Sequence, residues 1–169
     1  MKTTSRIATS SAAGVSRRIL LAGTAVLFAS LFAWAPPAWS GEFFERNGVA
    51  IDGYDPVAYF TAGKPTRGQA DYSSEYKGSV FHFANAQNRD MFVKSPEKFA
   101  PQYRGFCAYG VSQGAKVKIE GDRWAVVDGK LYLNLNKQVQ TKWLEDVPGN
   151  INTAERNWFG IHSLTIAQL

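Results

Sequence analysis

The side chain with the most distinctive chemistry in this sequence is its single thiol, Cys107. It stands in the segment 105–114, where glycine, serine and aromatic residues predict a loop. One cysteine excludes an intrachain disulfide and any zinc site built from paired thiolates within one chain. Three roles stay open for it: a small buried apolar residue, a soft-metal ligand with Cu(I) as the natural ion, and a reactive or intermolecularly paired thiol.

Two other side chains could share a metal ion with Cys107. His82 alternates with two phenylalanines in a strand pattern, so its imidazole should face away from the core, into solvent or a cleft. Met91 carries a soft thioether, although its helical spacing beside Phe92 also fits a core position. We therefore expect Cys107, His82 and Met91 as the metal ligands, with copper as the ion.

A second group of side chains would suit a small molecule instead of a metal. An aromatic wall combined with hydroxyl and amide groups is typical of small-ligand sites. Tyrosines that bury their rings and satisfy their hydroxyls locally would produce the same pattern, so both interpretations stay open. The residues of this predicted ligand site are Tyr54, Tyr59, Tyr109, Gln113 and Asn134.

Motifs for catalysis are missing from the sequence, so we do not expect an enzyme. It contains no recognisable acid/base pair, phosphate-binding loop or nucleophile motif. A couple of Cys107 with His82 could activate a thiolate, but nothing in the sequence sets their separation or supplies a third, orienting group. Asp55, directly before Pro56, is better explained as a helix cap.

Charge and length separate a leader from the rest of the chain. The protein has 169 residues and a net charge of +5. Four of its basic residues and no acidic residue lie in 1–40, so residues 41–169 are close to neutral. Without a clustered basic face, a nucleic-acid partner is not expected. The remaining chain is long enough for one domain.

Residues 1–40 have the features of an export signal. The pair Arg17-Arg18 precedes an uncharged, mostly apolar run of 17 residues, 19–35, and small residues at Ala38 and Ser40 predict cleavage before Gly41. The arginine pair resembles the twin-arginine export motif, with the general secretory route as the alternative. We expect a periplasmic protein that meets the membrane only through this leader before cleavage; an uncleaved anchor is the alternative.

The pattern of residues 41–169 predicts a small α+β domain made of antiparallel hairpins and short helices. Two hairpins should turn at Lys77-Gly78 and at Asp128-Gly129. Their arms are residues 72–76 and 79–83, and residues 123–127 and 130–135. In the last arm, alternation places the leucines toward the core and Tyr132 and Asn134 outward.

Asparagines at the ends of both hairpins should cap helices. Asn85 precedes a predicted helix at 86–94, and Asn136 precedes one that runs to about residue 147, where Pro148-Gly149 should end it. A final helix is expected near 151–159, followed by a tail. No internal repeat is evident in the sequence.

Five motifs, in this order, resemble the YHS domain and an exported bacterial branch of it. They are Gly53-Tyr54-Asp55-Pro56-Val57-Ala58-Tyr59-Phe60, Tyr76-Lys77-Gly78 with Phe81-His82-Phe83, Ser95-Pro96-Glu97-Lys98-Phe99, Gly105-Phe106-Cys107-Ala108-Tyr109, and residues 126–134. The resemblance implies a small heavy-metal-binding module of the kind found in copper-transport proteins. Its metal-binding cysteines would fall at Ala58, Ala84 and Asn88, so all three thiols are absent here.

Together, these features predict a periplasmic, single-domain binding protein whose ligand is a transition metal such as copper. Two alternatives stay open: a module that binds a small molecule or a partner after losing its metal site, and a thiol-based redox role for Cys107. One thiolate with few partners would bind a metal weakly. We therefore consider a homodimer in which two Cys107 residues share the ion.

Overall fold

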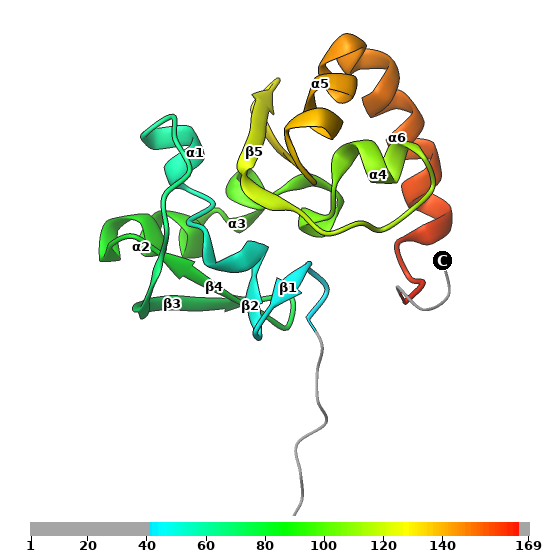
Figure 1. Cartoon of the computed structure of the whole chain (residues 1–169). Coiled ribbons are helices and arrows are strands. Elements are labelled where there is room, and N and C mark those ends of the chain that lie inside the picture. Colours follow the sequence, from blue (N-terminus) through cyan, green and yellow to red (C-terminus); the bar gives the residue numbers. More distant parts are fainter. Residues whose placement is uncertain (1–40, 166–169) are drawn as a thin grey trace, which may run out of the picture. The chain divides into compact units, whose positions relative to one another are not determined.

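The computed structural model describes residues 41–165 (Figure 1). The predicted export signal and its cleavage site lie before these residues, so the structure does not bear on them. Within the described part of the chain, no helix is long and apolar enough to cross a membrane.

The described chain has an α+β fold, as predicted, with three separate two-stranded antiparallel sheets. The first sheet is a very short hairpin, and the other two are the predicted hairpins (Figure 1). In chain order the elements are β1 (Glu45–Arg46), β2 (Val49–Ala50), η1 (Ile51–Gly53), α1 (Ala58–Thr61), β3 (Gln69–Tyr76), β4 (Ser79–Phe83), α2 (Ala86–Lys94), α3 (Pro96–Phe99), η2 (Gln102–Gly105), α4 (Ala108–Ser112), β5 (Glu120–Val127), β6 (Lys130–Asn134), α5 (Lys137–Glu145) and α6 (Val147–Ile161).

The expectation that the chain has no internal repeat is wrong, because the same backbone unit occurs twice. Strands β3 and β5 have eight residues each, β4 and β6 five, and α2 and α5 nine. Every boundary from β3 to α2 recurs 51 residues later. The strand registers also break at matching places, between Gln69 and Ser73 and between Glu120 and Trp124. We call residues 51–99 the first repeat and residues 103–161 the second repeat.

Local sequence signals account for the matching turns and caps. The turn residues Lys77-Gly78 have φ of 50° and 75°, and Asp128-Gly129 have 50° and 73°, as a two-residue hairpin turn requires. The side chain of Asn85 accepts the backbone N–H of Asn88 at 2.8 Å, and Asn136 accepts that of Val139 at 2.9 Å. Both predicted hairpins and both predicted caps are confirmed.

Each repeat begins with a tight turn of three residues in the left-handed region. In the first repeat, Ile51-Asp52-Gly53 have φ of 45°, 57° and 74°; in the second, Tyr103-Arg104-Gly105 have 53°, 53° and 76°. This conformation is unfavourable for non-glycine residues, above all for a β-branched one such as isoleucine. Phe44 joins the turns, because its N–H donates to the Arg104 carbonyl and its carbonyl accepts the Ile51 N–H, both at 2.8 Å.

One apolar cluster runs through both repeats. Between them, the hydroxyl of Tyr59 donates to the Gly121 carbonyl at 2.6 Å, and the Tyr59 ring lies 5.2 Å from that of Trp124. Helices α4 and α6 lie side by side in the second repeat (Figure 1). Asn157 of α6 donates from Nδ2 to the carbonyls of Val111 and Ser112, which secures the end of α4.

Three expectations about the second repeat are wrong. Residues 105–114 were expected to form a loop but contain helix α4. This helix begins after Cys107, and the sulfur of Cys107 accepts the N–H of Gly110 in its first turn. Pro148 lies in the first turn of α6, which begins at Val147, because proline fits that turn and Asp146 caps the helix. Tyr132 and Asn134 are buried, with 2% and 0% exposure, because α4 and α5 cover the face of β6 that was expected to meet solvent.

Candidate functional site

The most heavily hydrogen-bonded carboxylate of the described chain is that of Asp55, which is fully buried. Its Oδ1 accepts the backbone N–H groups of Val57 at 2.8 Å and Ala58 at 3.2 Å. Its Oδ2 accepts the backbone N–H of Ala84 at 2.9 Å and Nδ2 of Asn88 at 2.6 Å. Asp55 thus caps the turn before α1, as predicted, and also ties that turn to the end of β4 and the start of α2.

Three of these four donors stand at the positions where the resemblance to YHS domains places metal-binding cysteines: Ala58, Ala84 and Asn88. The fold therefore gathers these positions in one corner, as a metal site would need. In this chain, however, the corner contains a carboxylate and four N–H donors that satisfy it. Donor groups cannot coordinate a cation, and no thiolate is present among them. The corner around Asp55 is a closed structural cluster.

Cys107 occupies the matching corner of the second repeat, 52 residues after Asp55. Its sulfur accepts the Gly110 N–H at 3.3 Å and lies 3.7 Å from Oδ1 of Asn134. The backbone N–H groups of Leu135 and Tyr109 also favour its charged form. The donors at 110 and 135 are the counterparts of those of Ala58 and Ala84 beside Asp55. The thiol therefore lies in the same backbone cradle that holds a carboxylate in the first repeat.

The Cys107 thiol is free, and none of its surface is exposed. Burial raises the pKa of Cys107, and the three backbone N–H groups oppose that effect only in part. A neutral, enclosed thiol is poorly suited to nucleophilic attack or disulfide exchange. The surroundings of Cys107 in the structure are therefore those of a structural residue at the start of α4.

His82 and Met91 lie on other elements. His82 is half-buried on β4, opposite Ser73 of β3, and Met91 is half-buried on α2, packed against the apolar cluster. Among residues 41–165, no hydrogen bond links either of them to Cys107, and no group of three or more His, Cys, Asp or Glu side chains is arranged to hold a metal ion. The proposed trio is not a preformed site within the described part of the chain.

The residues predicted to line a small-molecule site fall into two sets. Tyr59 is buried and already bonded to Gly121, and burial raises its pKa. Tyr54 packs so closely on Gly121 that a Cβ there would overlap its ring, and the Arg67 guanidinium covers it at 3.9 Å from the ring centre. These two tyrosines are built into the joint between the repeats.

The other set surrounds α4. The Oδ1 of Asn134 accepts the backbone N–H of Tyr109 at 3.3 Å, and Gln113 donates from Nε2 to Oγ of Ser112 at 3.1 Å. The Nδ2 of Asn134 is buried and has no hydrogen-bond partner among the described residues. These side chains mainly secure α4, and Asn134 is the one with an unused donor.

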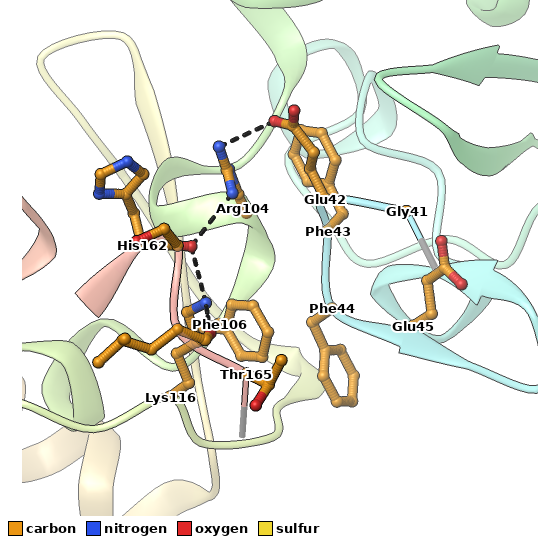
Figure 2. Close-up of a pocket in the computed structure, with 12 residues that line it drawn as sticks. Gly41, Glu42, Phe43, Phe44, Glu45, Arg104, Phe106, Lys116, His162 and Thr165 are labelled. Carbon is orange, nitrogen blue, oxygen red and sulfur yellow. Dashed lines mark hydrogen bonds and ion pairs between the residues drawn. The ribbon is translucent and has the colours of Figure 1, made fainter. Parts of the chain in front are cut away.

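A pocket that the sequence did not predict lies between the start of the described chain and the second repeat (Figure 2). It has a volume of about 470 Å³. Arg104 and Lys116 approach it from different segments, and the rings of Phe44 and Phe106 supply apolar walls. Its lining residues are Gly41, Glu42, Phe43, Phe44, Glu45, Arg104, Phe106, Lys116, His162, Ser163, Leu164 and Thr165.

The two cations of this pocket hold the segment after α6. Nη1 of Arg104 donates to the His162 carbonyl at 3.2 Å, and Nζ of Lys116 donates to the carbonyls of His162 at 2.8 Å and Leu164 at 2.5 Å (Figure 2). Nη2 of Arg104 also pairs with Glu42 at 2.9 Å. Burial, and then the nearby Arg104, lower the pKa of Lys116. No motif marks these residues, because they lie on separate segments and only the fold brings them together.

Comparison with known proteins supports the YHS resemblance for part of the chain. The family model of the YHS domain matches residues 57–103. No curated protein and no solved structure matches the chain. The matched segment contains the Asp55 partners Ala58, Ala84 and Asn88 and ends where the second repeat begins.

Proposed function

We propose that this protein is an exported binding protein in which a YHS domain has lost its thiolate metal site and a small molecule is the ligand. The observation that carries the proposal is the corner around Asp55. The positions expected for metal-binding cysteines converge there, yet their backbone and side-chain donors are all directed at a buried carboxylate. A soft cation would have to displace Asp55 from four hydrogen bonds and would find no thiolate.

The pocket beside the second repeat supports a small molecule as the ligand. Its volume of about 470 Å³ lies in the range that small-molecule sites occupy, roughly 300 to 1,000 Å³. Aromatic walls and a few convergent charged groups line it, which is the usual composition of such sites. Binding, as opposed to catalysis, fits a chain whose only thiol is buried with a raised pKa.

Export to the periplasm is part of this proposal. It is supported by the apolar run after Arg17-Arg18 and by the small residues that precede Gly41. The twin-arginine route would carry the domain across the membrane already folded. N-terminal sequencing of the protein from a periplasmic extract tests this part, with Gly41 expected as the first residue.

Metal binding through Cys107 is the second candidate, supported by the YHS match and by the softness of a thiolate. Copper would be the expected ion, with His82 and Met91 as further ligands or a second copy of Cys107 across a homodimer. This candidate requires the second repeat to rearrange, because the sulfur is enclosed in the described structure.

Equilibrium dialysis against Cu(I) and against Zn²⁺ separates the two candidates. We expect the wild type and Cys107→Ser to retain equally negligible metal after washing. The matched control is the triple variant Ala58→Cys, Ala84→Cys, Asn88→Cys, which should gain near-stoichiometric metal, because the fold already gathers these positions. Stoichiometric metal in the wild type that Cys107→Ser loses would reject the proposal and establish the second candidate.

A further inference from the structure

We infer that the pocket beside the second repeat binds a small organic carboxylate with an apolar body, and that Arg104 and Lys116 hold its carboxylate. This inference rests on the proposed function and names the chemical class of its ligand. It is carried by the two cations and the apolar walls of this pocket, and by the different charge of the second turn residue in the two repeats.

In the first repeat, the left-handed turn carries a carboxylate that pairs with arginine side chains. The guanidinium of Arg67 covers the ring of Tyr54 at 3.9 Å and pairs through Nη2 with Asp52 at 3.2 Å. Nη1 of Arg67 also donates to the Asp52 carbonyl. Asp52 is the second residue of the left-handed turn, and the aromatic residue follows the turn directly. Nη1 of Arg46 pairs with the same carboxylate oxygen at 3.2 Å, so Asp52 lies between two cations.

In the second repeat, the counterpart of that anion is a cation. Arg104 is the second residue of the matching left-handed turn, and Phe106 follows that turn as Tyr54 follows the first. Lys116 comes from the segment that joins α4 to β5, in which Lys118 is the residue that matches Arg67. The Nζ of Lys116 lies 5.4 Å from the centre of the Phe106 ring. The second repeat thus has a cation at the turn position that holds a carboxylate in the first, and Lys116 adds a second cation to the pocket.

Only one of the two cations, Arg104 and Lys116, is paired with a carboxylate among the described residues. Glu42 neutralises Arg104, but among residues 41–165 Lys116 forms no ion pair with a carboxylate and donates to backbone carbonyls. Arg104 lies close enough to Lys116 to lower its pKa further than burial alone does. Like charges held together in a partly buried place repel each other, and a bound anion would remove that cost. Glu45 lies toward Gly41, on the other side of the pocket (Figure 2).

A left-handed turn places Arg104 at the pocket. Tyr103 and Arg104 are consecutive non-glycine residues with φ of 53°. Here, the Phe44 N–H fixes the turn through the Arg104 carbonyl.

The other walls define the body of the ligand. The rings of Phe44 and Phe106 meet edge to face with centres 5.9 Å apart, and Leu164 adds aliphatic surface. An apolar group would pack here, while inorganic ions would leave these walls uncovered. Because Glu42 already neutralises one cation, a single negative charge matches the site better than the double charge of a phosphate. These features select a monocarboxylate.

Isothermal titration of the full-length gene product with benzoate, benzamide and inorganic phosphate tests the inference. We expect benzoate to bind and to shift the amide NMR signals of Phe44, Phe106 and Lys116, whereas benzamide and phosphate bind at least about tenfold more weakly, the loss expected for a charge-assisted contact. Arg104→Gln and Lys116→Gln should weaken benzoate binding by a similar factor. Arg67→Gln, which removes a cation near the left-handed turn of the first repeat, is the control and should leave it unchanged.

Further variants guard against loss of folding. Lys116→Arg keeps the charge and should keep benzoate binding, and thermal unfolding of each variant shows whether the second repeat is intact. Equal binding of benzoate and benzamide, tight binding of phosphate, or full binding by folded Lys116→Gln would each overturn the inference. Benzamide binding in the pocket without a benzoate preference would leave the proposed small-molecule function standing. Absence of all binding together with stoichiometric metal uptake would overturn both.

Discussion

The two repeats share one backbone and differ in the chemistry that they enclose. In the first repeat, the inward residues of the hairpin and helix are the phenylalanines Phe81, Phe83 and Phe92, and the polar group is the carboxylate of Asp55. In the second repeat, the same places hold Tyr132, Asn134, Trp143 and the thiol of Cys107. The first corner thus has an anion with a full set of donors, and the second has a neutral thiol beside an amide.

This difference shows which interactions define the unit and which are free to vary. Both copies keep the glycine turn, the asparagine cap and the left-handed entry, because these set the backbone. The enclosed side chains differ, and the second copy is less completely satisfied. Nδ2 of Asn134 and Nε1 of Trp143 are buried without hydrogen-bond partners among the described residues. Each such donor costs about 1 to 3 kcal/mol, so the second repeat is less well optimised for stability.

The strongest test of this comparison is the removal of the two corner residues. Asp55→Ala leaves four buried or half-buried donors without an acceptor, and we expect it to lower the free energy of unfolding by about 3 to 5 kcal/mol. Cys107→Ala removes a weaker acceptor from the matching cradle and should cost about 1 to 2 kcal/mol. Urea unfolding followed by tryptophan fluorescence measures both. Equal losses of unfolding free energy in Asp55→Ala and Cys107→Ala would contradict the stronger hydrogen bonding that we assign to the first corner.

The dependence of stability on alkaline pH should show that the Cys107 thiol is neutral in the folded protein. Burial raises the pKa of Cys107, so the thiolate is favoured in the unfolded chain and the free energy of unfolding falls as pH rises. Above about pH 8.5, the ordinary value for a cysteine, the wild type should lose up to about 1.4 kcal/mol per pH unit more than Cys107→Ser. Unfolding curves of both proteins between pH 7 and 10 measure this. Parallel curves would contradict a buried, neutral thiol.

The smallest expected effect concerns the asparagine helix caps that both repeats share. Asn85→Ala and Asn136→Ala each remove one side-chain cap, at 2.8 and 2.9 Å, and should each cost about 1 kcal/mol. Gln87→Ala and Gln138→Ala, exposed and two residues after each cap, are the matched controls and should change stability by less than about 0.5 kcal/mol. Clearly different losses of stability in Asn85→Ala and Asn136→Ala would argue against equivalent helix starts.

The repeat itself could have been found in the sequence by spacing. In each copy, the capping asparagine follows the turn glycine by seven residues, Gly78 to Asn85 and Gly129 to Asn136. Few other residues coincide, because core positions accept different apolar side chains when their volume is maintained. Looking for similar residues misses such a duplication, whereas comparing the spacing of turns and caps detects it.

The sequence by itself determined the hairpins, the asparagine-capped helices, the cap at Asp55 and the α+β class. These features depend on backbone preferences and hydrogen bonds within a few residues, which local sequence expresses directly. Only the tertiary structure decided that Asn134 is buried, that Ala58, Ala84 and Asn88 meet at one carboxylate, and that Arg104 lies near Lys116. Burial and charge pairing depend on segments that are distant in the chain, and no local pattern records which of them will pack together.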